Sequence, residues 1–177
     1  MRLSKYIVPL ILAAAVTGCG KDNHKTQKEK STIEWNNARA SVMGSLAKDQ
    51  YQTGNFDNAR VTIGEALKLN PKSTELRLLS ARLAIEEGNL ELADREVKQV
   101  QKNDDKSAEA DYLAGVIFQR WQKNDAALNA YAGAAEKNPN ELAYLLAKAE
   151  MLVALDRADD AIRLLQDKVV FFEHSAT

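Results

Sequence analysis

The sequence predicts an all-α fold, a solenoid of about four helix–turn–helix repeats, on the strength of three regularities. An alanine recurs at a constant interval, at Ala59, Ala93, Ala127 and Ala161. Gly54 and Gly88 keep the same interval, and Pro71 and Pro139 lie two intervals apart. The interval is the length of a helical hairpin repeat, about 34 residues. Because one such hairpin cannot bury its apolar face alone, hairpins stack into a continuous array that offers a concave binding surface.

Each recurring position has a physical role in such a hairpin. The eighth position of the first helix is small in every repeat, so that the paired helices can approach closely in a densely packed interior. These residues are Ala47, Ala81, Gly115 and Ala149. The glycines tolerate the positive φ that ends a first helix. The prolines stop a second helix without breaking an internal hydrogen bond.

These positions resemble the tetratricopeptide repeat (TPR) family over roughly residues 40–175. The first repeat matches best, with Ala47, Gly54, Phe56, Ala59, Ile63, Ala66 and Pro71 in the family's spacing. The resemblance implies a right-handed superhelical solenoid with repeats at about 40–73, 74–107, 108–141 and 142–175. Later repeats depart from the pattern, because Asp105 replaces a proline and Gln122 and Asp156 replace glycines.

The apolar periodicity and the turn residues predict eight helices. They are expected at roughly 33–52, 57–69, 74–87, 90–102, 108–122, 125–137, 142–154 and 158–172. Ile33 and Trp35 extend the first helix and are expected to cover the exposed end of the stack. One folded domain is therefore predicted over residues 33–177.

Residues 1–18 are predicted to be a signal peptide. Arg2 and Lys5 give a positive start, and an apolar run over residues 6–16 follows. This run is shorter than the ~20 residues that a spanning helix needs. Residues 19–32 follow with lysines and polar side chains, and we expect them to form a flexible tether.

The apolar run ends in Val16-Thr17-Gly18-Cys19, which resembles the lipobox of bacterial lipoproteins. The resemblance implies that the sulfur of Cys19 carries a diacylglyceryl group and that cleavage occurs just before it. An ordinary secretory signal is the alternative, but the only cysteine of the chain lies at this position. Gly20 follows, which implies placement in the outer membrane, facing the periplasm, in a host with two membranes.

No arrangement of residues typical of an enzyme is visible in the sequence. His24 and His174 lie in the tether and at the far end of the chain, and neither has the spacing of metal ligands. No glycine-rich phosphate loop or paired-cysteine zinc pattern occurs. A net charge of −1 gives no general attraction to nucleic acid. We therefore expect a non-catalytic protein without a cofactor or a metal.

The TPR resemblance implies that first-helix residues line the concave groove and bind a protein or peptide. The residues at the family's groove positions are Lys48, Tyr51, Gln52, Leu78, Arg82, Ile85, Glu86, Tyr112, Val116, Gln119 and Arg120, followed by Leu146, Glu150 and Val153. Tyr112 and Ile85 are the least suited to water and are the preferred contacts. The asparagines of the family's carboxylate clamp are missing, so that specificity is not expected.

The expected function is a lipid-anchored scaffold of the bacterial envelope. The order of lipobox and repeats also resembles the pilotin lipoproteins of type IV pili. The apolar run at residues 169–172 lies at an uncovered edge and has two interpretations. Either the chain is the N-terminal part of a larger repeat protein or enzyme, or this edge pairs with a second copy or a partner.

Overall fold

The structure is a computed structural model that describes the backbone of residues 21–175 and the side chains of residues 26–167. The predicted signal peptide and Cys19 lie outside these residues. The described chain falls into two units, one ending at Trp35 and one beginning at Asn36. The first unit is helical from Lys21, and its described side chains are all exposed.

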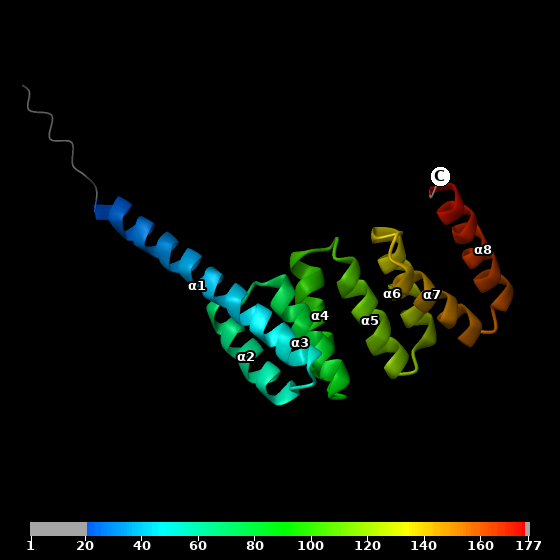
Figure 1. Cartoon of the computed structure of the whole chain (residues 1–177), viewed down its shortest axis with the longest axis horizontal. Helices are drawn as coiled ribbons and strands as arrows, with labels where there is room; N and C mark the ends of the chain where they lie inside the picture. Colours follow the sequence, from blue (N-terminus) through cyan, green and yellow to red (C-terminus); the bar gives the residue numbers. More distant parts are fainter. Residues whose placement is uncertain (1–20, 176–177) are drawn as a thin grey trace, which may run out of the picture. The chain divides into compact units, whose positions relative to one another are not determined.

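Eight helices and no strand make up the described residues (Figure 1). The helices are α1 (Lys21–Gln52), α2 (Phe56–Leu69), α3 (Thr74–Glu86), α4 (Leu90–Asn103), α5 (Ala108–Arg120), α6 (Asn124–Lys137), α7 (Leu142–Ala154) and α8 (Ala158–Ser175). Consecutive helices pair, α3 with α4, α5 with α6 and α7 with α8, and each pair contacts the next. The all-α repeat fold is therefore confirmed.

The beginning of α1 differs from the prediction. The helix starts at Lys21 rather than at residue 33, so most of the predicted flexible tether is helical. No glycine or proline occurs between Lys21 and Met43, and the segment is rich in lysine, glutamate and glutamine, which are good helix formers. Since the described side chains up to Trp35 are exposed, this part of the helix is stabilised by local helix propensity and not by packing against other helices. The role of the segment as a spacer stays a prediction.

The recurring small residues pack where the sequence pattern predicted. Ala59, Ala93, Ala127 and Ala161 are all buried, and so are Ala47, Ala81, Gly115 and Ala149. At Gly115 the approach is closest, because a Cβ atom there would lie 2.5 Å from ring atoms of Tyr131. The repeat interval of the sequence is therefore a period of close helix–helix contact.

The four turns inside the hairpins share one geometry. Gly54 and Gly88 have φ of +75° and +76°, and the residues at the same place in the later repeats, Gln122 and Asp156, have φ of +59° and +58°. In each turn two N–H groups donate back to carbonyls of the preceding helix, as Lys123 does to Phe118 at 2.9 Å. This is the pattern of a Schellman motif, which satisfies carbonyls at a helix end.

The connections between hairpins also repeat, a regularity that was not predicted from the sequence. The N–H groups of Asn70, Asp104 and Asn138, each one repeat interval from the next, donate to carbonyls of the preceding helix. Three residues further on, side chains cap the next helix. These capping residues are Ser73, Ser107 and Glu141. The hydrogen bonds at the helix ends thus hold the repeats in a regular order.

Candidate functional site

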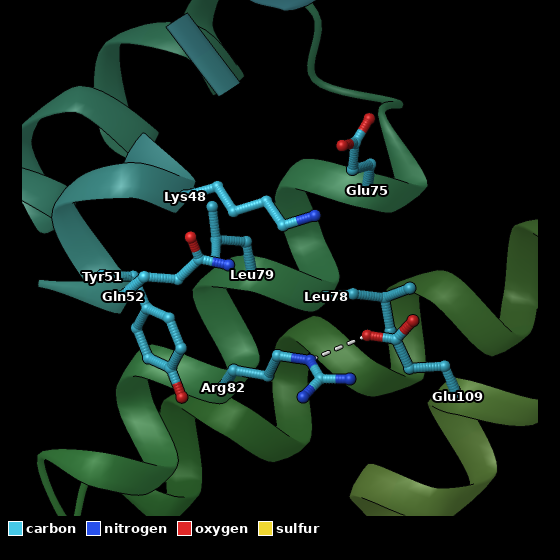
Figure 2. A pocket seen from close by; sticks show the side chains of 8 residues that line it. All are labelled: Lys48, Tyr51, Gln52, Glu75, Leu78, Leu79, Arg82 and Glu109. Atoms are coloured by element: carbon cyan, nitrogen blue, oxygen red, sulfur yellow. Dashed lines mark hydrogen bonds and ion pairs between the residues drawn. The ribbon is translucent and has the colours of Figure 1, made fainter. Parts of the chain in front are cut away.

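The first helices of three successive hairpins surround a pocket of about 400 Å³. It is lined by Lys48, Tyr51 and Gln52 of α1, Glu75, Leu78, Leu79 and Arg82 of α3, and Glu109 of α5 (Figure 2). We call it the α1–α3–α5 pocket. It combines an apolar floor with charged side chains, which is the composition of a surface that recognises a peptide.

Two cations of the pocket differ in their partners. The Nε of Arg82 donates to Oε1 of Glu109 at 2.8 Å, and both side chains are partly exposed. Lys48 forms no ion pair with any residue that the structure describes, and Figure 2 shows its ammonium group extending into the pocket. Lys48 is therefore free to bind an acidic group of a partner.

Tyr51 contacts residues of its own hairpin and of the next one. Its ring lies 5.7 Å from that of Phe56, centroid to centroid, and its hydroxyl donates to Glu86 at 3.5 Å. Burial raises the pKa of the Tyr51 hydroxyl, and the negative charge of Glu86 raises it further. The hydroxyl therefore stays protonated at neutral pH and can donate a hydrogen bond.

Five of the predicted groove residues line this pocket: Lys48, Tyr51, Gln52, Leu78 and Arg82. Glu75, Leu79 and Glu109 also line the pocket and were not among the predicted residues. The repeat spacing contained a signal for two of them, because Glu75 and Glu109 lie one repeat interval apart, each at the second position of its helix.

Ile85, one of the two preferred contact residues, is only 5% exposed. It belongs to the core that α3 and α4 form with α5, so neighbouring helices rather than solvent surround its side chain. The prediction assumed that this apolar side chain lies on the groove surface and that a partner covers it. In the structure, α5 of the next hairpin already buries the side chain of Ile85. Glu86, the residue that follows, is exposed and accepts the hydrogen bond of Tyr51.

The remaining predicted residues lie further along α5. The ring of Tyr112 packs between those of Tyr131 and Tyr144, at centroid distances of 5.6 and 5.0 Å. Val116 is half-buried beside this cluster. Gln119 accepts a hydrogen bond of 2.6 Å from the hydroxyl of Tyr131, whose pKa is raised mainly by burial.

Arg120, in the last turn of α5, is exposed. Leu146, Glu150 and Val153, the groove positions of the fourth repeat, line a different cavity between α7 and α8. Most of the predicted groove residues thus lie in one of two cavities or in the aromatic cluster around Tyr112, whereas Ile85 is buried in the core and Glu86 and Arg120 lie outside both cavities.

The described residues hold no group of three or more His, Cys, Asp or Glu side chains placed to bind a metal ion. None of the helices in the same part of the chain is both long and apolar enough to cross a membrane. What the described residues do bring together is a pocket lined by carboxylates, cations and an aromatic ring.

Comparison with known proteins agrees with the repeat fold. Residues 50–117 match the model of the tetratricopeptide repeat. Among curated proteins, none is similar to the chain in sequence.

Three solved structures illustrate the likeness of fold. The first TPR domain of RPAP3, bound to the HSP90 peptide SRMEEVD, has a TM-score of 0.63 and 17% identity, covering 67% of this chain and 94% of that one. MamA of Desulfovibrio magneticus RS-1 has a TM-score of 0.67 and 20% identity, covering 77% and 76%. PilF of Pseudomonas aeruginosa has a TM-score of 0.68 and 17% identity, covering 75% of this chain and 60% of that one. At these identities the likeness shows a TPR-type solenoid.

Proposed function

We propose that this protein is a non-catalytic scaffold that binds a segment of another protein in the α1–α3–α5 pocket. The observation that supports the proposal is that three features meet at the same cavity: a cation without an ion pair among the described residues, a paired cation and an apolar floor. A TPR-type fold suggests protein–protein interaction, and the related fold of RPAP3 was solved with a peptide bound.

The pocket favours a segment that carries both an acidic and an apolar side chain. Lys48 has no ion pair among the described residues, so a partner carboxylate gains an attraction without breaking an existing one. Leu79, which is partly exposed, offers apolar area beside it, and the buried Leu78 lies beneath. Removing apolar surface from water stabilises the complex, while the charge sets its orientation and specificity.

Crosslinking in cells followed by mass spectrometry tests this proposal. We expect Lys48→Glu to remove partners from the crosslinked set, because it places a carboxylate where the partner's acid would bind. The matched control is Lys68→Glu, the same change of charge at an exposed position of α2. An identical partner set for wild type and Lys48→Glu would contradict the use of this pocket.

We further propose that the scaffold is anchored by lipid on Cys19 and works in the cell envelope, at the outer membrane facing the periplasm. The support is the lipobox-like sequence at the end of the apolar run. Several acyl chains at ~0.8 kcal/mol per buried methylene hold a protein stably on a membrane. The pocket would then recruit a periplasmic partner to the membrane surface.

The Cys19→Ser variant tests the anchor. We expect it to lose labelled palmitate and to move from the membrane fraction to the soluble fraction. Retention of the label would show that another residue carries the lipid. Retention in the membrane without label would contradict anchoring through Cys19.

A pilotin-like role in assembling the secretin of type IV pili is the second candidate. It is supported by the order of a lipobox followed by repeats. In a host with such pili, deletion of the protein should reduce the secretin found in the outer membrane. Secretin levels that do not change would leave the general scaffold as the better proposal.

A further inference from the structure

The last hairpin carries an apolar cavity of its own, away from the α1–α3–α5 pocket. It has a volume of about 470 Å³ and lies between α7 and α8. Its lining residues are Leu146, Ala149, Glu150, Val153, Ala158, Ala161, Ile162 and Leu165. We call it the α7–α8 groove. Val153 is 56% and Ile162 is 52% exposed, so large apolar side chains meet water here.

In earlier hairpins, side chains at equivalent repeat positions are buried by other helices of this chain. The counterparts of Leu165 in the three earlier repeats are Tyr131, Val97 and Ile63, which are all buried. Two repeats before Leu146 and Val153 lie Leu78 and Ile85, and both are buried in a core that α5 completes. The α7–α8 groove therefore corresponds to the surface of α3 and α4 on which α5 packs.

The helices α3, α5 and α7 each pack onto the preceding hairpin, and they show which pattern of apolar residues fits this surface. The residues that pack onto the preceding hairpin recur at positions i, i+3 and i+7 of each first helix. They are Leu76, Leu79 and Leu83 in α3, Ala110, Leu113 and Ile117 in α5, and Tyr144, Ala147 and Met151 in α7. The i+7 residues Leu83, Ile117 and Met151 are all buried. An occupant thus needs apolar residues on one helical face, with a long one at i+7.

Charge adds a second requirement for the occupant. Arg82 pairs with Glu109, the residue at i−1 of α5. One repeat earlier the same two positions hold Lys48 and Glu75, which line the same pocket.

One repeat later than Arg82 and Glu109 the two positions hold Val116 and Ala143, an apolar pair. In each of these three cases the two positions hold residues of opposite charge or two apolar residues. In the α7–α8 groove the position of Arg82 is taken by Glu150. A complementary helix carries a lysine or arginine at i−1.

We propose that the α7–α8 groove binds an amphipathic helix of another protein, with apolar residues at i, i+3 and i+7 and a basic residue at i−1. The corresponding face of α1 in a second copy fits poorly. It offers Val42, Ser45 and Asp49, so a carboxylate would be buried at i+7. Burial of an unpaired carboxylate is costly. This site is separate from the α1–α3–α5 pocket and does not depend on its function.

Synthetic peptides that copy α5 provide the probe. One peptide has the sequence of residues 107–121, with Glu109 at i−1, and the other has Glu109→Lys; both are acetylated and amidated. The full chain is titrated into each labelled peptide, and fluorescence anisotropy is measured at low salt. We expect the lysine peptide to bind about fivefold more tightly than the glutamate peptide, since an exposed charge pair is worth about that much.

Variants at exposed positions locate the site and its charge. Glu150→Arg should reverse the preference, so that the glutamate peptide binds more tightly. Val153→Lys should abolish binding of both peptides, while the matched change Val61→Lys on α2, where Val61 is 60% exposed, should leave binding unchanged. Circular dichroism confirms that each variant is folded.

Three outcomes would overturn the proposal. The first is that neither peptide binds wild type, and the second is that Glu150→Arg leaves the preference as it was. The third is that the full chain alone sediments as a dimer that Val153→Lys converts to a monomer, because a second copy would then occupy the groove.

Discussion

At the scale of single residues, the turn inside each hairpin has the same left-handed backbone in all four repeats, but only two repeats place glycine there. For a residue with a Cβ atom this conformation costs roughly 1–2 kcal/mol, although aspartate tolerates it better. Gln122 has no such compensation from a short polar side chain. The third hairpin therefore carries strain that Gly54 and Gly88 avoid in the first two.

The Gln122→Gly variant should be more stable than wild type by about 0.5–1 kcal/mol, after the entropy that glycine loses on folding is subtracted. Asp156→Gly should gain less, because aspartate suits the conformation. Thermal unfolding followed by circular dichroism measures both changes. As a control, Gly88→Ala should be less stable than wild type. A Gln122→Gly variant that is less stable would show that the Gln122 side chain has a role beyond the turn.

The repeat spacing predicted which residues point toward the candidate site better than it predicted which of them are accessible. Lys48 and Arg82 line the pocket because their position in the first helix fixes their direction. The burial of Ile85 depends instead on how α5 packs over α3 and α4. Such packing involves residues of three helices, so the spacing within one helix does not predict which side chains are buried.

At the scale of helices, the ends were predicted where the residue at the end has a special geometry. Gly54 and Gly88 mark the ends of first helices, and Pro71 follows the end of α2. The start of α1 carried no such marker, because a polar helix and a polar tether have the same composition. Only the absence of glycine and proline after Lys21 distinguished them.

The beginnings of the second helices allow a matched test of capping. Asn55 and Asn89 hold the same place in successive hairpins, but only the side chain of Asn89 accepts a hydrogen bond, from the N–H of Leu92 at 3.2 Å. We expect Asn89→Ala to lower the free energy of unfolding by about 1 kcal/mol and Asn55→Ala to lower it by less. Urea unfolding measures both. Equal losses would mean that the cap of α4 contributes nothing specific.

At the scale of the whole molecule, the described hairpins contact their neighbours in sequence, so stability is transmitted from one hairpin to the next. In an array of this kind the total stability is close to a sum of hairpin terms and neighbour terms. A lesion in an inner hairpin weakens interfaces on both sides. A lesion in the last described hairpin weakens the interface on one side and leaves the others in place.

Ala93→Trp and Ala161→Trp make the same change at the same repeat position, in α4 and in α8, and both alanines are buried. Overpacking costs typically about 1–3 kcal/mol at a dense contact. We expect Ala93→Trp to lower Tm more, because the hairpin of α3 and α4 contacts a hairpin on each side and α5 packs against α4. Hydrogen exchange should show lost protection from α2 through α6 in Ala93→Trp, and only in α7 and α8 in Ala161→Trp. Equal and uniform losses of protection would mean that the array unfolds as one unit, and the nearest-neighbour description would then be wrong for this chain.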